Sequence, residues 1–153
     1  MISWLAFAAL CFAAALSGAL FKPGAWHAAL AKPRWHPPNW LFGPAWAVLY
    51  LMIATAGWLV WHAAGWSPAL VAWGVQLVLN AGWSWLFFGL RRPDLAFAEV
   101  ILLWLSILVC VLLFAPVSRL AAALMLPYLA WVTFAAALNF AMWRLNGGRP
   151  RFA

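Results

Sequence analysis

Residues 26–50 read WHAALAKPRWHPPNWLFGPAWAVLY, a stretch in which tryptophan and proline are interleaved. Proline lacks an amide N–H, fixes φ and pushes the preceding residue away from the helical region, so residues 32–44 cannot form one continuous helix. We predict a stiff loop, with at most a short helix near residues 26–31. The tryptophans give this loop large apolar faces, each with one N–H donor. Such a loop suits either the lipid headgroup layer or a lid over a cavity.

The composition defines the class of protein. Of 153 residues, 69% are hydrophobic and only 7% are charged, whereas a soluble domain carries roughly 25% charged residues. We therefore predict an integral membrane protein. The sequence pI near 10.9 reflects basic residues placed between apolar runs, which indicates membrane topology rather than nucleic-acid binding. Cys11 and Cys110 each lie within an apolar run, so we expect buried free thiols.

Five apolar runs are each long enough for a helix to cross a bilayer core, which takes about 20 residues. We place these spans at residues 2–21, 44–62, 69–89, 95–114 and 121–143. The first run has no basic segment before it, so we interpret it as a helix rather than a signal peptide. With no long linker and no convincing repeat, residues 1–153 are expected to form one domain. The predicted fold is an all-α bundle of five transmembrane helices.

The basic residues divide unequally between the two sides that these spans define. One side receives eight of them: Lys22, Lys32, Arg34, Arg91, Arg92, Arg144, Arg149 and Arg151. The other side receives only Arg119. Since Lys and Arg concentrate on the cytoplasmic side of membrane proteins, we predict that the first loop and the C-terminus are cytoplasmic.

Polar side chains form stripes on two of the spans. Gln76, Asn80 and Ser84 recur every four residues, with Trp83 beside them, so they share a helix face. Amides are costly in lipid unless they are paired, so this face must meet protein, water or a ligand. Hydrogen bonds between helices and a ligand-facing role are both compatible with the pattern. A second stripe follows the last span: Trp131, Ala135, Asn139 and Trp143.

Two further features of the spans have competing interpretations. Gly74 and Gly82 are small residues eight apart, which suggests close packing against another helix, including one from a second copy. Glu99 is an intramembrane acid and hence a candidate functional group. Its position near a helix N-terminus and near Arg91 and Arg92 offers a simpler explanation.

Several kinds of catalytic and metal site are excluded by the sequence. Ser84 has no histidine and acid on its stripe, which argues against hydrolase chemistry, and no glycine-rich phosphate loop is present. His27 and His36 share the first loop, but His62 falls on the opposite side of the membrane. A three-histidine metal site is thereby excluded, and haem ligation by His27 or His36 remains open.

Three segments together resemble a known family. They are KPRWHPPNW at 32–40 followed by Trp46 and Tyr50, QLVLNAGWS at 76–84, and PYLAW at 127–131 with Leu-Asn pairs at 138–139 and 145–146. This order and spacing resembles the tryptophan-rich sensory protein (TspO) family, which includes the mitochondrial translocator protein, or peripheral benzodiazepine receptor. The resemblance implies a five-helix bundle, usually dimeric, with a cavity under the first loop. It also implies binding of porphyrins such as protoporphyrin IX and haem intermediates, and in some members of sterols and benzodiazepine-type drugs.

Site residues follow from the resemblance by position. The implied cavity lining is Trp46, Tyr50, Gln76, Asn80, Trp83, Trp131 and Asn139, and the implied lid is Trp26, His27, Trp35, Pro37 and Pro38. His27 departs from the family, which commonly has tyrosine there. The sterol-recognition pattern is absent, because no Lys or Arg occurs within five residues after Tyr128. That motif is a weak one, and its absence makes cholesterol a poor candidate.

The expected function is that of a membrane receptor or sensor that binds porphyrins and regulates tetrapyrrole metabolism or a stress response. We expect a homodimer in lipid, with no required cofactor, no metal and no nucleic-acid partner. The ligand is expected between Trp46 and Trp131, while Lys32 and Arg34 either meet its propionates or serve only as topology signals. The alternatives are a transporter of porphyrins or sterols, disfavoured by the lack of an inverted repeat, and a light-dependent porphyrin-degrading enzyme.

Overall fold

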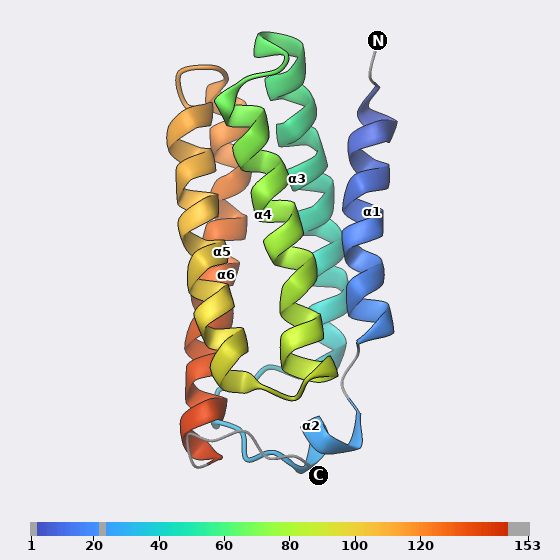
Figure 1. Cartoon of the computed structure of the whole chain (residues 1–153), viewed down its shortest axis with the longest axis vertical. Helices are drawn as coiled ribbons and strands as arrows, with labels where there is room; N and C mark the ends of the chain where they lie inside the picture. Colours follow the sequence, from blue (N-terminus) through green and yellow to red (C-terminus); the bar gives the residue numbers. More distant parts are fainter. Residues whose placement is uncertain (1–2, 22–23, 147–153) are drawn as a thin grey trace.

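The computed structural model describes residues 3–21 and 24–146, and within these ranges the chain consists of helices joined by short loops. In chain order the elements are α1 (Trp4–Leu20), α2 (Ala25–Ala29), the 3₁₀ turn η1 (Asn39–Leu41), α3 (Phe42–Ala64), α4 (Pro68–Ser84), the π-helical turn η2 (Trp85–Gly89), α5 (Pro93–Phe114) and α6 (Arg119–Leu145). The long helices α1, α3, α4, α5 and α6 run side by side, and the short α2 lies beyond one end of them (Figure 1).

Four helical segments of the described chain are long and apolar enough to cross a membrane: Asn39–Ala64, Pro68–Gly89, Pro93–Phe114 and Arg119–Leu145. The helix Trp4–Leu20 is also apolar but shorter, at 17 residues. The prediction of an all-helical membrane protein is therefore confirmed. The fifth span, placed at residues 2–21, stays a prediction, and residues 1–2 lie outside the described part.

The helix boundaries follow from local chemistry. Ser67 caps α4, since its Oγ accepts from the Leu70 N–H at 3.3 Å, and Ser118 caps α6 by accepting from the Ala121 N–H at 3.2 Å. Serine side chains satisfy N–H groups that the first turn of a helix leaves unpaired. Pro44 lies in the first turn of α3, where a missing N–H costs nothing. The predicted interruption of the helix between residues 32 and 44 is thus found at Leu30–Pro38, before η1.

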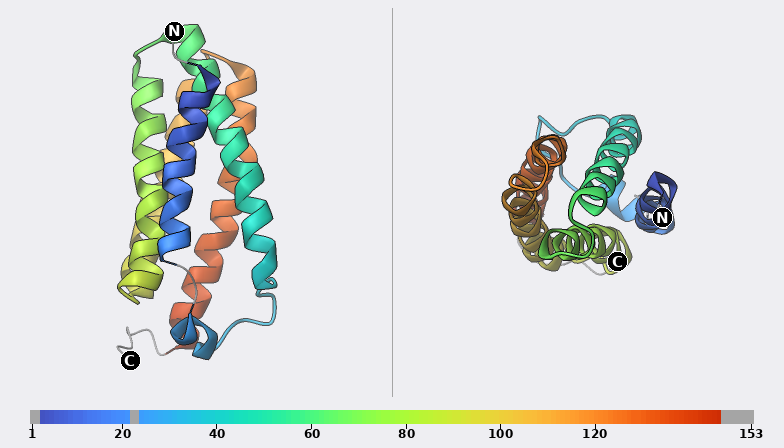
Figure 2. Two further views of the ribbon diagram at one scale, coloured as in Figure 1. Left: turned by 90° about the vertical axis from the view of Figure 1, so that its right-hand side faces the viewer. Right: turned by 90° about the horizontal axis from the view of Figure 1, so that it is seen from above.

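The interior of the bundle is filled by apolar side chains from all five long helices. Ile53, Val60, Ile107, Phe114 and Met125 are completely buried. Packing joins α5 to α4 and α6, α3 to α1 and α6, and α1 to α4, and Figure 2 shows the long helices end-on from above. The perimeter carries exposed leucines and valines on every long helix, as expected of a surface that faces lipid.

The two ends of the bundle differ in charge. Figure 1 shows that the loop containing α2, the turn after η2 and the last turn of α6 share one end. Among the described residues this end carries five basic side chains: Lys32, Arg34, Arg91, Arg92 and Arg144. Arg119 lies at the opposite end, at the start of α6. Lys22, Arg149 and Arg151 of the predicted partition lie outside the described residues.

The predicted roles of Glu99 and of the glycine face need correction. Arg92 pairs with Asp94, with 2.8 Å between Nη2 and Oδ2, so the basic turn does not account for Glu99. The carboxylate of Glu99 is buried, and its oxygens have no hydrogen-bond partner in the described part of the chain. It faces α4, where a Cβ on Gly82 would lie 3.5 Å from Oε1. Gly74 meets nothing within 4 Å, so the two glycines do not share one face.

Candidate functional site

A cavity of about 500 Å³ lies at the lid end of the bundle. Its wall takes residues from every long helix, from η2, from α2 and from the loop up to η1. Pockets that hold small organic ligands commonly measure about 300–1,000 Å³. The volume therefore suits a sizeable organic molecule rather than a single ion.

Six of the seven predicted lining residues surround this cavity: Trp46, Tyr50, Asn80, Trp83, Trp131 and Asn139. Gln76 does not line it. Its side chain is fully buried, and its Nε2 donates to the backbone carbonyl of Trp73 at 2.8 Å. Gln76 precedes Asn80 by one helical turn, about 6 Å along the axis. That shift places it beyond the floor of the cavity, where it packs between helices.

The floor is a hydrogen-bonded chain across three helices. The hydroxyl of Tyr50 on α3 donates to Oδ1 of Asn80 on α4 at 2.6 Å. Nδ2 of Asn80 then donates to the hydroxyl of Tyr128 on α6 at 2.8 Å. Sequence reasoning did not assign Tyr128 to the site, because its position suggested only the sterol pattern. Its completely buried hydroxyl instead fixes the amide that lies beneath the ligand space.

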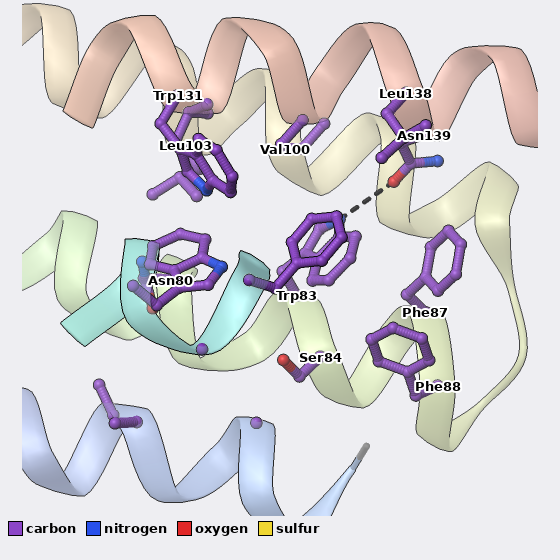
Figure 3. A pocket seen from close by; sticks show the side chains of 18 of the residues that line it. Asn80, Trp83, Ser84, Phe87, Phe88, Val100, Leu103, Trp131, Leu138 and Asn139 are labelled. Carbon is purple, nitrogen blue, oxygen red and sulfur yellow. Dashed lines mark hydrogen bonds between the residues drawn. The ribbon is translucent and has the colours of Figure 1, made fainter. Parts of the chain in front are cut away.

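A second network fixes the aromatic wall nearer the lid. Nε1 of Trp83 donates to Oδ1 of Asn139 at 3.0 Å (Figure 3). The amide of Asn139 also donates to the carbonyl of Pro93 at 2.9 Å, which ties α4, α5 and α6 together. The Trp83 ring stacks on Phe87, with ring centres 5.0 Å apart and planes 22° apart. The indole face is therefore preorganised before any ligand arrives.

Trp46 and Trp131 touch each other instead of bracketing an open gap. Their ring centres are 6.3 Å apart and their planes cross at 87°. A flat ligand held between two parallel rings needs roughly 7 Å, twice the contact distance of carbon atoms. In this arrangement the two rings leave no room for a flat ligand stacked between them, and the predicted ligand position stays a prediction. The pair forms one corner of the wall, and a ligand would lie alongside it.

Trp131 also presents an unused hydrogen-bond donor. Its Nε1 is buried and has no partner among the described residues, and Figure 3 shows its ring directed into the cavity. Buried donors are nearly always paired. Because this nitrogen has almost no accessible surface, a ligand in the cavity would reach it only after the ring turned.

Most of the side chains predicted for the lid do not face the cavity. His27, His36 and Asn39 line the cavity, whereas Trp26, Trp35, Pro37 and Pro38 do not. The Trp26 ring lies edge-on to Phe87 at 5.8 Å, and the Trp35 ring lies edge-on to Phe134 at 5.7 Å. Both indoles thus anchor the lid to the bundle, while the two prolines directly follow His36 and stiffen the chain.

The charges predicted for the mouth of the cavity are engaged elsewhere. Nζ of Lys32 donates to the carbonyl of His27 at 2.7 Å and to the carbonyl of Leu30 at 3.2 Å. This cation therefore caps the C-terminal end of α2, where helix carbonyls lack partners. Arg34 is exposed and does not line the cavity.

The two lid histidines contribute neutral rings. Burial lowers the pKa of His27 to about 4, helped by the nearby charge of Lys32 and by His36. Burial also lowers the pKa of His36. The described cavity wall holds no lysine, arginine, aspartate or glutamate. At neutral pH the wall is consequently uncharged, with amides, imidazoles, indole N–H groups and the hydroxyls of Tyr50 and Ser84 as its polar elements.

Three parts of the wall were not foreseen. They are the small residues Ala14, Ala15 and Gly18 of α1, the pair Phe87 and Phe88 of η2, and Val100 and Leu103 of α5. None of these residues carries a polar atom in its side chain, so the search for polar stripes in the sequence did not identify them. In η2 the Leu90 N–H reaches the Trp85 carbonyl at 2.8 Å, the spacing of a π-turn, which is frequent at functional sites.

Comparison with known proteins agrees with this architecture. The profile of the TspO/MBR family matches residues 7–144. The tryptophan-rich protein TspO of Chlorobaculum tepidum is 42% identical, over 90% of this chain and 91% of that protein. The translocator protein of Homo sapiens is 40% identical, over 80% of this chain and 76% of its own length. Since the profile runs from α1 to the last turn of α6, it includes every long helix around the cavity, and the chain belongs to the TspO/MBR family.

Proposed function

We propose that this membrane protein is a receptor or sensor that binds tetrapyrroles, such as protoporphyrin IX, in the cavity under the lid. The observation that carries the proposal is an uncharged chamber of about 500 Å³ whose wall includes three indoles. Aromatic faces gain roughly 0.5–1.5 kcal/mol per stacked pair beyond the burial of area. A wide flat macrocycle is the kind of molecule that uses several such faces at once.

Polar groups of the wall are arranged to orient such a ligand. Asn39, Asn80 and Asn139 line the cavity and bring amide groups to it from η1, α4 and α6. A propionate or a ring nitrogen of the macrocycle would accept from these donors. The proposed binding needs no cofactor and no nucleic acid.

The names of relatives are in keeping with this role. One relative, from Cereibacter sphaeroides, is named tryptophan-rich sensory protein and is 40% identical. The mammalian relatives are named translocator protein. A sensor and a carrier would both begin with capture of a ligand in a membrane-embedded cavity.

The decisive experiment introduces a bulky side chain into the cavity and leaves the polar residues of its wall unchanged. Ala135 lines the cavity, whereas Ala137 on the same helix is exposed at the perimeter. Ala135→Phe should weaken binding of free-base protoporphyrin IX by roughly tenfold or more, which corresponds to about 1.4 kcal/mol. Ala137→Phe adds the same side chain to the lipid face and should leave the dissociation constant unchanged. Equal losses in both variants would contradict binding in this cavity.

A second pair of variants tests for light-dependent chemistry in the same cavity. Trp131→Phe removes a wall indole, while Trp104→Phe removes one that lies outside the cavity and donates to Thr133 at 2.8 Å. Titration in the dark should show a roughly fivefold loss of protoporphyrin affinity for Trp131→Phe alone, from about 1 kcal/mol of lost interaction. Illumination that yields a product dependent on Trp131 would favour the degrading enzyme over the sensor.

The proposal includes an orientation and an assembly. The lid end, with its five described basic residues, faces the cytoplasm, because positive residues are retained on that side. The chain pairs with a second copy through an exposed helix face in lipid. Both statements rest on charge placement and on small residues, and each is open to a direct test.

A further inference from the structure

We propose that the His27 imidazole is an axial ligand for the metal of a metallated tetrapyrrole, with His36 as the second imidazole within reach of that metal. This inference rests on the proposed function and deepens it, because it concerns the same cavity and names the form of ligand that the lid selects.

The two rings come from separate parts of the lid and meet at the cavity. His27 belongs to α2 and His36 to the loop before η1, yet both line the cavity and their ring centres lie 6.0 Å apart. His27 is only 5% exposed. No hydrogen bond from its ring nitrogens is found in the described part of the chain, so its lone pair is not engaged by the protein.

Neighbouring rings hold both imidazoles in place. His27 lies edge-on to Phe88 at 5.4 Å and to Phe87 at 6.2 Å, and the Lys32 cap holds the end of its short helix. The His36 ring lies 6.0 Å from the Phe42 ring, and the backbone N–H of His36 closes a turn onto the Pro33 carbonyl at 3.0 Å. Ligands held in this way lose little freedom when a metal arrives.

The spacing of the rings suits a shared metal. A metal–nitrogen bond to histidine is about 2.0–2.1 Å, and the nitrogen lies roughly 1.1 Å from the ring centre. Two imidazoles that bind one metal from opposite sides, as axial ligands of a tetrapyrrole must, therefore have centres about 6.2–6.4 Å apart. The observed 6.0 Å is close to that separation. Neutral imidazole is also the form that ligates metals, and both rings are in that form at neutral pH.

The residue types of the cavity wall favour a chelated metal over a hydrated ion. It offers imidazoles and amides but no carboxylate or thiol within the described lining, and a naked divalent ion there would lack anionic ligands. A tetrapyrrole supplies four nitrogens, balances the charge of the metal and leaves axial positions open. Histidine is the usual axial ligand of haem iron, and the aromatic wall accommodates the macrocycle itself.

The test uses the full chain in detergent micelles, titrated with iron(III) protoporphyrin IX and, separately, with the free base. His27→Phe keeps an aromatic ring between Phe87 and Phe88 but cannot ligate. His62→Phe is the matched control, because His62 lies at the other end of α3, against Trp58. The readouts are the Soret band, the spin state by electron paramagnetic resonance, and the dissociation constant.

We expect His27→Phe to change the Soret position and the spin state of the bound iron compound and to weaken its binding by roughly tenfold or more, since losing a ligand costs at least as much as losing a supporting residue. Free-base binding should be unchanged in His62→Phe, and in His27→Phe the loss for the iron compound should exceed any loss for the free base by roughly tenfold. Addition of imidazole to His27→Gly should restore the spectrum of the wild type. A six-coordinate spectrum that also needs His36 would support two imidazole ligands.

Other outcomes separate the two proposals. If the free base binds and the spectrum of the iron compound is the same in the wild type and His27→Phe, axial ligation is wrong and the proposed function stands. If neither compound binds, the proposed function fails as well. If zinc chloride alone binds in a manner that needs His27, a bare ion rather than a metallated tetrapyrrole occupies the site, and the inference is overturned.

Discussion

Asn146 and Ala31 form a reciprocal pair of hydrogen bonds that joins the end of α6 to the lid. Oδ1 of Asn146 accepts from the Ala31 N–H at 3.0 Å, and its Nδ2 donates to the Ala31 carbonyl at 3.0 Å. The same Nδ2 also donates to the carbonyl of Met142 at 2.7 Å. The side-chain amide thus satisfies both backbone groups of one lid residue, as a neighbouring strand would.

The first prediction concerns this fastening. Asn146→Ala should loosen the lid, because the Ala31 backbone loses both partners, each worth about 0.5–1.5 kcal/mol. Hydrogen exchange of the amides at 25–36 should accelerate by roughly tenfold or more, which corresponds to the loss of about 1.4 kcal/mol. Exchange in the middle of α5 should not change, which distinguishes lid opening from global loss of stability.

Asn146→Asp is the matched variant, because it keeps an acceptor for the Ala31 N–H and loses the donor to the carbonyl. Its effect on exchange should fall between those of the wild type and Asn146→Ala. If Asn146→Ala leaves exchange of the lid unaltered, the anchoring of Trp26 and Trp35 alone holds the lid, and the amide is not needed.

A second prediction addresses the Tyr50–Asn80–Tyr128 chain at the cavity floor. Asn80→Leu preserves approximate volume but leaves two hydroxyls without their partner, at about 1–3 kcal/mol for each buried unsatisfied group. The midpoint of thermal unfolding in detergent should fall by several degrees. Ser106→Ala is the control, because the Ser106 hydroxyl only donates to the Leu103 carbonyl of its own helix, and it should have little effect. Equal shifts in both variants would rule out a structural role for the floor.

Sequence reasoning succeeded where a polar or bulky side chain carried the signal. Asn80, Trp83 and Asn139 line the cavity, where the family resemblance implied them, and the polar stripes had marked their helix faces as ones that must meet protein, water or a ligand. Gln76 satisfied the same rule by bonding to the Trp73 carbonyl within its own helix. The periodicity of a helix fixes a face but does not fix how deep along that face a cavity extends.

The lid was harder to predict for a different reason. Prolines identify a loop, yet the direction of each side chain depends on dihedral angles that composition does not encode. Trp26 turned towards Phe87 and Trp35 towards Phe134, which left the imidazoles of His27 and His36 to face the cavity. The residues that α1 contributes to the cavity wall were not predicted either. Alanine and glycine make room for a ligand because they are small, and their side chains carry no polar group that would indicate a binding site.

The third prediction fixes orientation across the membrane. Trp40 and Trp66 lie at opposite ends of α3 and are 72% and 79% exposed. The native cysteines, Cys11 and Cys110, are buried, so a membrane-impermeant maleimide should react only with an introduced thiol. In intact cells Trp66→Cys should be labelled from outside, and Trp40→Cys should react only after the membrane is permeabilised. The opposite pattern would place the lid outside the cell.

The last prediction separates two glycines on α4. Gly74 has open space where a Cβ would point, and its neighbours Val71 and Val78 are 60% and 73% exposed. A small residue on an exposed face lets the backbone of a second helix approach closely, which drives association in lipid. Gly74→Leu should therefore shift the protein towards monomer in detergent, as measured by cross-linking yield or light scattering, while the unfolding midpoint of the monomer is retained.

Gly82→Leu is the informative counterpart, because Gly82 packs inside the chain. A Cβ there would lie 3.5 Å from Oε1 of Glu99, so the rest of a leucine side chain would collide with that buried carboxyl group and displace it. Forcing extra methylenes into a packed interior typically costs about 1–3 kcal/mol, and this variant should lose thermal stability. A dimer that survives Gly74→Leu intact would show that α4 contacts the second copy through another face or not at all, because a leucine at a close helix crossing separates the backbones that the glycine had allowed to meet.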